Sequence, residues 1–276
     1  LLSYSRAAEE LALTQPAVSA QVRQLEQLTG ERLFEYRGKQ LHITRAGQVL
    51  ERAARDMQQR LVGVEMELAE LRGEIKGTLS LAAETSAQYF VPDILARFSA
   101  RFPQVQINLE IDNRARTLKR LLDNRQELVI MCSPPEDRSI HFTPFRENQL
   151  TIAAWPEHPL STQKNIPFAT LAKESFLVRE AGSGTKLILD ELFRQTAVHP
   201  KTTHQLGSSE AIIAGVTNQL GIALLPVDSC ARELAQNQLI ALDIANYPIR
   251  RSWCILHRRN QSLTPVCEQF KQLITA

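Results

Sequence analysis

The chain has 276 residues, of which 43% are hydrophobic and 22% charged, an ordinary composition for a globular protein of about two domains. The 32 basic and 30 acidic residues leave a formal net charge of +2, so charge alone gives almost no support for nucleic-acid binding. The sequence lacks an apolar run long enough to cross a membrane and a signal-peptide pattern, which predicts a cytoplasmic protein with no membrane partner.

The four cysteines are far apart in sequence and form no C-x-x-C pair, which favours reduced thiols over disulfides or a zinc site. They are Cys132, Cys230, Cys254 and Cys267. Because the chain begins without methionine, we also expect its first domain to be truncated at the N-terminus.

Two short helices are predicted at the start of the chain. Residues 6–11 have apolar side chains at helical spacing, with Ser5 placed to cap them. Thr14 is a suitable N-cap for a second helix, and Pro16 fits its first turn. The second helix has an apolar stripe made of Val18, Val22, Leu25 and Leu28. Two helices joined by a tight turn are typical of a helix-turn-helix, although two packed helices of an ordinary helical domain would give the same pattern.

A two-stranded hairpin is predicted next, since Leu41 and Ile43 alternate with a polar residue and Arg37 and Lys39 flank a glycine at the tip. Such a hairpin beside the second helix would be a basic wing. The early residues of the second helix would enter the major groove, where Gln15, Ser19 and Gln21 could read base edges.

The stretch from Ser3 to Glu26 closely resembles the DNA-binding signature of LysR-type transcriptional regulators, and residues 33–35 and 41–47 resemble its wing. In the family one further helix precedes this stretch. The resemblance favours the helix-turn-helix over an ordinary helical domain and implies double-stranded promoter DNA as a partner. The candidate DNA-binding residues are Ser5, Arg6, Thr14, Gln15, Pro16, Ser19, Gln21, Arg23, Gln24, Arg37 and Lys39.

A long helix at residues 48–74 is predicted to link the two domains. Its apolar residues are spaced alternately four and three apart over three heptads, which favours pairing with a second copy over a core-facing surface helix. The candidate dimerisation residues are Leu50, Ala54, Met57, Leu61, Val64, Leu68 and Leu71. Gly73 and Gly77 mark the end of the helix.

From Thr78 onward, strand patterns alternate with helix patterns in two runs, which predicts two α/β lobes with parallel sheets. Residues 150–155 would lead to the second lobe, and residues 253–257 would return. Small hydroxyl residues follow several predicted strands, where helix N-termini would face a cleft and favour an anion, although helix capping alone would also select them. The candidate effector-binding residues are Thr85, Ser86, Cys132, Ser133, Ser183, Thr185, Ser208 and Ser209, with Lys186 nearby.

This half of the chain resembles LysR-type regulators of RuBisCO and carbon-fixation operons. The likeness lies in residues 84–92, 131–136, 176–185, 206–212 and 249–253. It implies a small-molecule, anionic effector. Many such regulators have a glycine and an arginine where this chain has Cys132 and Ser133, so the identity of the effector stays open.

Three other functions fit the sequence less well. An enzyme is disfavoured because Ser183 to Lys186 fits an S-x-x-K motif without its companion motifs, and because nucleophile-elbow, P-loop and zinc-hydrolase patterns are lacking. A solute-binding protein would not need a helix-turn-helix. A peroxide sensor would need two cysteines near the start of the second lobe, where residues 176–229 contain none.

The sequence therefore predicts an α+β multidomain transcriptional regulator of LysR type without catalytic residues, cofactor or metal. It has a winged helix-turn-helix at 1–47, a linker helix at 48–74 and a periplasmic-binding-protein-like effector domain at 78–276. Lobe I covers about 78–155 and 257–276, and lobe II about 156–256. We expect a homodimer or homotetramer that binds operator DNA and an effector, with RNA polymerase as a further candidate partner. Activation and repression both stay open.

Overall fold

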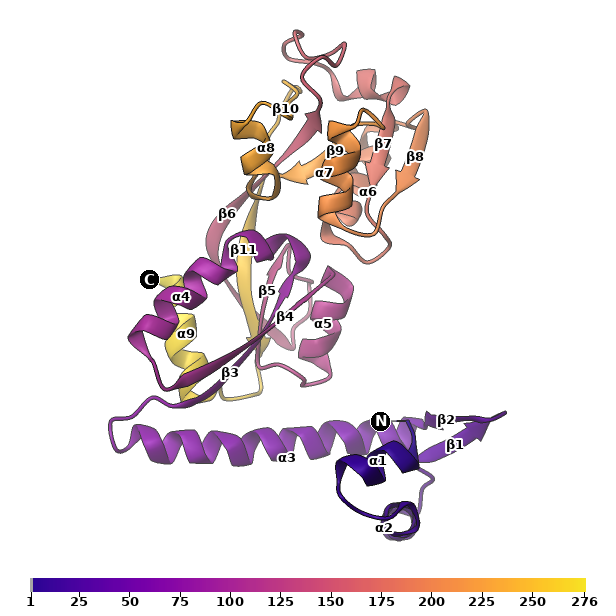
Figure 1. The fold of residues 1–276 in the computed structure, drawn as a ribbon, viewed down its shortest axis with the longest axis vertical. Helices are drawn as coiled ribbons and strands as arrows, with labels where there is room; N and C mark the ends of the chain where they lie inside the picture. The colour runs from indigo at the N-terminus through magenta and orange to yellow at the C-terminus, as the bar shows by residue number, and fades with distance from the viewer. Residues whose placement is uncertain (1) are drawn as a thin grey trace. The chain divides into compact units, whose positions relative to one another are not determined.

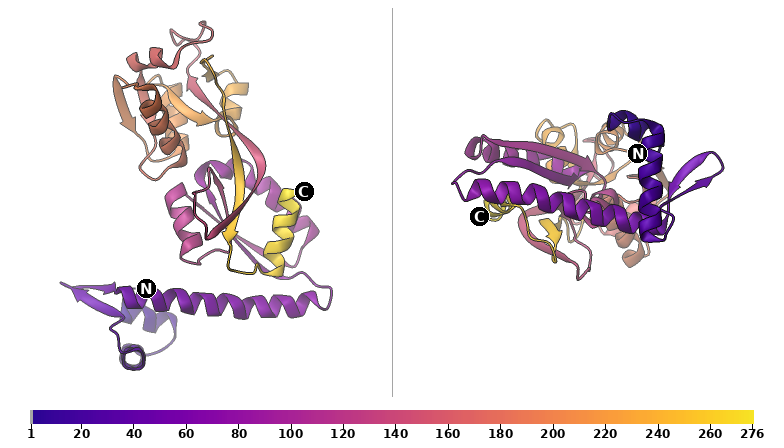
Figure 2. Two further views of the ribbon diagram at one scale, coloured as in Figure 1. Left: turned by 180° about the vertical axis from the view of Figure 1, so that it is seen from behind. Right: turned by 90° about the horizontal axis from the view of Figure 1, so that it is seen from below.

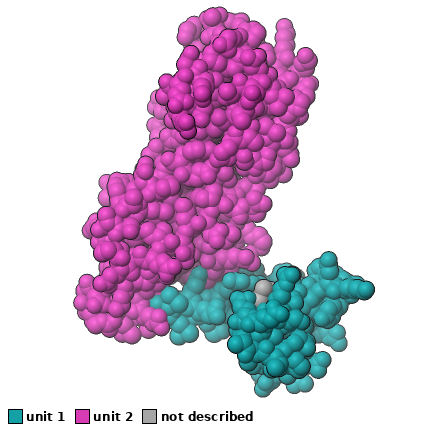
Figure 3. Space-filling model, viewed as in Figure 1, with its two compact units in different colours: residues 1–62 teal, residues 63–276 magenta. Residues whose placement is uncertain are grey.

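The computed structural model describes residues 2–276, which form two compact units divided after Val62 (Figure 3). The first unit contains the helix-turn-helix, and the second contains two α/β lobes. None of the helices in the described part of the chain combines the length and apolar character needed to cross a membrane.

The first unit is a winged helix-turn-helix. Its elements are α1 (Tyr4–Glu10), α2 (Gln15–Thr29), β1 (Phe34–Arg37) and β2 (Gln40–Ile43). Thr14 is the N-cap of α2, as predicted, and its hydroxyl accepts the Ala17 N–H. The predicted cap of α1 was wrong: Ser3, not Ser5, accepts the Arg6 N–H, so the helix begins earlier. Strands β1 and β2 are antiparallel, and Gly38 occupies a left-handed conformation at the tip between them.

The apolar stripe of α2 is only partly a core face. Val18 is buried, but Leu25 and Leu28 are exposed on the described chain. The spacing correctly predicts a helix, whereas burial depends on what else packs against that face, and spacing does not carry this information.

Helix α3 (Arg45–Glu70) follows the wing and continues across the boundary between the units. It begins three residues before the predicted start, because Thr44 accepts the Gly47 N–H at its first turn. The predicted end at residue 74 was wrong: the helix ends at Glu70, because the chain turns there with Gly73 in a left-handed conformation, so Leu71 lies just beyond the helix. In the second unit, Met66 and Ala69 are buried, and the Met66 side chain lies against Gly77.

Lobe I is built around three parallel strands, with β3 between β4 and β5. Its elements are β3 (Gly77–Glu84), η1 (Thr85–Tyr89), α4 (Val91–Arg101), β4 (Val105–Asp112), α5 (Arg114–Leu122), β5 (Leu128–Cys132) and α9 (Pro265–Thr275). Phe98 of α4 meets Phe270 of α9 edge-on at 5.2 Å, so the C-terminal helix closes the core of the first lobe (Figure 1).

Lobe II has its own apolar cores, in which Phe176 and Phe193 meet edge-on at 5.1 Å. Its elements are η2 (Phe168–Lys173), β7 (Ser175–Val178), α6 (Gly184–Thr196), β8 (Thr202–Gln205), α7 (Ser209–Thr217), β9 (Ala223–Pro226), η3 (Val227–Cys230), α8 (Ala231–Ala235) and β10 (Ile240–Ala241). Strands β7 and β8 are parallel, as predicted for this lobe.

Two long strands join the lobes, β6 (Ile140–Ala154) and β11 (Ile249–Arg258), which run side by side from one lobe to the other (Figures 1 and 2). They are antiparallel to each other, and β11 pairs with β5 in lobe I while β6 pairs with β9 and β10 in lobe II. The expectation of purely parallel sheets was therefore wrong at the crossing. Trp253, assigned from sequence to lobe II, belongs to the core of lobe I, because this end of β11 pairs with β5.

Candidate functional site

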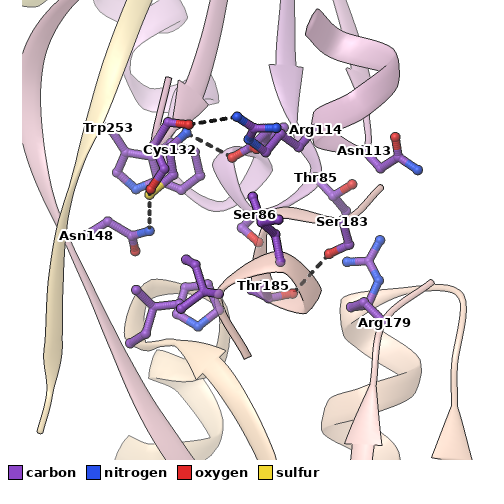
Figure 4. A pocket seen from close by; sticks show the side chains of 17 residues that line it. Thr85, Ser86, Asn113, Arg114, Cys132, Asn148, Arg179, Ser183, Thr185 and Trp253 are labelled. Atoms are coloured by element: carbon purple, nitrogen blue, oxygen red, sulfur yellow. Dashed lines mark hydrogen bonds between the residues drawn. The ribbon is translucent and has the colours of Figure 1, made fainter. Parts of the chain in front are cut away.

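A cavity lies between the lobes, with about 440 Å³ of empty space that includes its open mouth (Figure 4). Most of its polar lining comes from the C-terminal ends of β3 and β5 in lobe I and from the loop between β7 and α6 in lobe II. The lining residues are Glu84, Thr85, Ser86, Asn113, Arg114, Cys132, Ser133, Asn148, Leu150, Arg179, Ser183, Gly184, Thr185, Leu187, Ile188, Pro226 and Trp253.

The lobe I wall combines a cation with hydroxyl and thiol groups. Ser133 takes a left-handed backbone conformation after β5, with φ of 53°, and its carbonyl accepts a hydrogen bond of 3.0 Å from Arg114 Nη2. This places the Arg114 guanidinium beside the cavity. The Asn148 amide donates to Cys132 Sγ at 3.3 Å, and burial raises the pKa of that thiol, which keeps it protonated.

Glu84 puts a buried carboxyl group in the same wall. Its Oε2 accepts the Cys132 backbone N–H at 2.9 Å. Burial raises the pKa of Glu84 to about 7, because the charged form loses water; the Cys132 hydrogen bond and the Arg114 charge oppose this shift.

The lobe II wall is the start of α6. Gly182, with φ of 90°, allows the turn that precedes the helix, and the Ser183 and Thr185 hydroxyls lie 3.0 Å apart. Ser183 is the N-cap residue, yet its side chain makes no capping hydrogen bond, so free helix N–H groups and two hydroxyls face the cavity. This arrangement suits an anionic group.

Arg179 adds a second cation from the end of β7. It is buried, and it donates from Nη1 to Ser209 Oγ at 2.9 Å and from Nε to Glu180 Oε2 at 2.8 Å. The carboxylate of Glu180 also accepts from Asn113 Nδ2 of lobe I at 3.2 Å, and the pKa of Glu180 is lowered by these hydrogen bonds although burial opposes the shift. Glu180 and Ser209 therefore hold the Arg179 guanidinium at the cavity edge.

Further polar contacts join the lobes beside the cavity. Gln88 and Tyr89 both donate to Glu210 Oε1 on α7, at 2.8 and 2.9 Å. Arg146 contacts Asp228 at 3.0 Å. These bonds hold the lobes in the arrangement that encloses the cavity.

Of the eight candidate effector residues, six line the cavity: Thr85, Ser86, Cys132, Ser133, Ser183 and Thr185. Ser208 and Ser209 do not line it. Ser208 caps α7 by accepting the Ala211 N–H, and Ser209 lies behind Arg179. Lys186 also lies outside the lining and pairs with Asp190, one helical turn along α6.

Sequence reasoning did not select Glu84, Asn113, Arg114, Asn148, Arg179 and Trp253. Glu84 and Arg179 could have been found, because each stands at the carboxyl end of a predicted strand. Asn148 and Trp253 lie on the crossing strands, whose pairing is not visible in local patterns. Leu150, Leu187 and Trp253 add apolar groups to the lining.

The candidate DNA-binding residues lie on the surface of the first unit, exposed except for half-buried Ser19. A shallow groove brings together Ser5 of α1, Gln15 of α2 and Lys39 of the wing tip. Arg37 lies at the end of β1, but its guanidinium is paired with Glu35 at 2.6 Å. The groove is thus bordered by the start of the second helix and by the wing.

The candidate dimerisation residues form an apolar seam, and most of it is exposed on the described chain. Met57, Leu61, Val64, Leu68 and Leu71 are exposed. The residues that α3 does bury, such as Met66 and Ala69, lie at other heptad positions. The seam therefore does not serve as the core-facing side of the helix.

The four cysteines are buried and unpaired, and burial raises the pKa of each thiol. Across residues 2–276 there is no group of three or more histidine, cysteine, aspartate or glutamate side chains placed to hold a metal ion.

Comparison with protein families gives two matches. Residues 1–48 match the family described as bacterial regulatory helix-turn-helix protein, lysR family, and residues 72–276 match the LysR substrate binding domain.

Similar curated proteins include a RuBisCO operon transcriptional regulator of Acidithiobacillus ferrooxidans, 37% identical over 100% of this chain and 89% of that protein. The HTH-type transcriptional activator CmpR of Synechocystis is 35% identical over 99% of this chain and 90% of its own length.

Solved structures share the fold. The regulatory domain of Synechocystis CcmR in complex with 2-PG is 33% identical with a TM-score of 0.70, over 72% of this chain and 96% of that chain. Full-length CbnR complexed with its target DNA has a TM-score of 0.68 at 20% identity, over 99% of this chain and 93% of that one.

Proposed function

The chain belongs to the LysR family of bacterial transcriptional regulators, and we propose that it controls carbon-fixation genes in response to a small anionic metabolite. Its curated relatives at 35–37% identity are named as a RuBisCO operon regulator and as the activator CmpR. The likeness extends over the full chain, so it includes both the DNA-binding unit and the two-lobed unit.

The observation that carries the effector assignment is the cation-bearing cavity between the lobes. Arg114 from lobe I and Arg179 from lobe II border it, and the uncapped start of α6 presents N–H groups and hydroxyls to it. An anion there would gain charge-assisted hydrogen bonds from both lobes. The related CcmR regulatory domain was solved with 2-PG, a phosphorylated carboxylate, which is the class of ligand this lining suits.

We assign DNA binding to the groove bordered by Gln15 and Lys39, with the early residues of α2 in the major groove. We assign self-association to the exposed seam of α3, which would place two DNA-binding units on one operator. A protein that acts on promoter DNA works beside the chromosome, so we place it in the cytoplasm, where RNA polymerase is a further candidate partner. Its relatives are regulators, and we propose no catalytic role.

The effector would act by favouring one lobe arrangement over another. Ligand contacts to both walls stabilise the closed form, and regulation follows when the two arrangements bind DNA with different free energies. Because β6 and β11 are the connections between the lobes, their twist would change on closure.

The test uses the full chain. Fluorescence anisotropy would measure its binding to the promoter region next to its gene, and calorimetry its binding of 3-phosphoglycerate, ribulose bisphosphate, 2-phosphoglycolate and NADPH, with neutral sugars as controls. We expect at least one anion to bind and to alter the DNA affinity or its footprint. Binding of a neutral sugar with no response to any anion would refute the assignment of an anionic effector.

A further inference from the structure

One oxygen in the cavity wall is buried and has no hydrogen-bond partner. Glu84 is 5% exposed, and its Oε2 accepts the Cys132 N–H, whereas Oε1 has no partner among residues 2–276. A buried acceptor without a partner costs free energy, which a ligand bearing a donor would recover.

This oxygen faces the wall to which an anion is expected to bind. At Gly184, the first residue of α6, an added Cβ would lie 3.0 Å from Glu84 Oε1 and 3.5 Å from Oε2. The carboxyl group of lobe I thus lies next to the helix start that carries the Ser183 and Thr185 hydroxyls. An effector bound there meets a carboxylate as well as the two arginines.

The other buried polar atoms of the lining that lack a partner in the described structure are donors. They are Arg114 Nε and Trp253 Nε1. The cavity therefore offers unpaired donors together with one unpaired carboxyl oxygen. A ligand that satisfies all of them carries acceptor oxygens at one position and a hydrogen-bond donor at another.

Building on the proposed function, we propose that Glu84 is a specificity-determining residue that accepts a hydrogen bond from a hydroxyl group of the effector. The cavity then selects a hydroxylated anion over an anion that lacks a donor, because the latter leaves a carboxylate facing acceptor oxygens. The discrimination comes from an unfavourable contact with the wrong ligand as much as from a favourable contact with the right one.

The protonation of Glu84 gives this selection a pH signature. Burial raises the pKa of Glu84 to about 7 in the free protein. The groups around it are Arg114 on α5, the Cys132 thiol and N–H on β5, Asp112 beside it on β4, and the start of α6 at Gly184. A ligand hydroxyl that donates to the carboxylate favours the ionised form, so its binding releases a proton near pH 7. A ligand with acceptors alone favours the protonated form, so its binding takes up a proton.

The decisive variant is Glu84→Gln. The Cys132 N–H needs an acceptor, so the glutamine carbonyl takes that place and its NH2 group faces the cavity, which converts an acceptor into a donor. The probes are 3-phosphoglycerate, which has a hydroxyl group, and 2-phosphoglycolate, which has none. Calorimetry on the full chain should show that the wild type favours 3-phosphoglycerate, and that Glu84→Gln lowers this preference by about tenfold or more.

Glu127→Gln is the matched control. It makes the same change in lobe I at a carboxylate that accepts from Thr264 and Cys267 and lies outside the lining, so the preference should stay that of the wild type. Titrations of the wild type in two buffers of different ionisation enthalpy give the number of protons exchanged without any variant. We expect the 3-phosphoglycerate titration to release more protons, or to take up fewer, than the 2-phosphoglycolate titration.

Equal shifts in affinity for the two probes in Glu84→Gln, or equal proton exchange with both in the wild type, would overturn the role of Glu84 and leave the anionic effector standing. If neither probe and no other phosphorylated compound binds the wild type, the proposed function fails, and the role of Glu84 fails with it.

Discussion

Changing Leu61 and Leu68 to glutamate on α3 tests whether the exposed seam joins two protomers. Leu61 is 69% exposed and Leu68 is 50% exposed, so burial in a dimer would remove slightly more than one whole leucine side chain from water in each protomer. At about 1.5–3 kcal/mol for each fully buried leucine, the pair contributes about 2–4 kcal/mol per protomer and about 4–7 kcal/mol per dimer. Losing it should weaken association about a thousandfold or more, before any cost of burying the new charges.

Sedimentation velocity on the full chain over a range of concentrations measures this loss, and anisotropy with operator DNA shows whether half-sites are still bridged. The matched control is Val49→Glu with Val62→Glu, two exposed apolar residues of α3 off the seam. The control should sediment as the wild type does. If the seam variant keeps the sedimentation and DNA affinity of the wild type, the seam does not hold the dimer together.

Three further predictions concern single groups. The pKa of Glu84 is about 7 in the folded chain against an ordinary 4.5, so the folded state binds the extra proton and its stability falls as pH rises between these values, by about 3 kcal/mol. Glu84→Gln should therefore gain melting temperature relative to the wild type at pH 8 but not at pH 4; a gain equal at both would contradict this. Ser208→Ala removes the α7 cap and should lower the free energy of unfolding by about 1 kcal/mol, as measured in urea. Ser183→Ala removes no capping bond and should instead weaken anion binding in calorimetry. The opposite pattern would remove Ser183 from the site. Lys39→Ala should lower the slope of log DNA affinity against log salt concentration by about one. Ser19→Ala should instead cost about 1–3 kcal/mol of binding free energy at the operator alone. Gel shifts at two salt concentrations in which both variants behave like the wild type would refute the wing and helix assignments.

Local sequence patterns predict the elements of this protein well and their partners less well. Each of these features depends on residues that are close together in the sequence, so it can be seen in the chain itself. Examples are the heptad spacing of α3, the cap at Thr14 and the alternation of strands and helices after Thr78. The antiparallel pairing of β6 with β11 joins residues about a hundred positions apart, and short-range periodicity does not contain that information.

The same distinction between local patterns and distant partners explains which residues of the candidate site could be predicted. Hydroxyl residues that follow strands could be selected in advance, since the carboxyl ends of strands converge in an α/β lobe. Ser208 and Ser209 follow the same pattern but do not line the cavity, because Ser209 holds the Arg179 guanidinium and Ser208 satisfies a helix N–H. Whether a hydroxyl caps a helix or faces a ligand is decided by three-dimensional neighbours.

The joining of the lobes by two strands also affects how the sequence can diverge. Each lobe packs its own apolar clusters, with Phe98 and Phe270 in one and Phe176 and Phe193 in the other. Replacements within one interior should thus have nearly independent effects from those within the other, and relatives can acquire new ligand preferences by altering one wall at a time. Strands β6 and β11 are different, because each continues from one lobe into the other and β11 places Trp253 in the interior of lobe I while β6 places Leu150 in that of lobe II. A replacement that changes how these two strands pair would therefore disturb both lobes, so we expect evolutionary change to be slowest there.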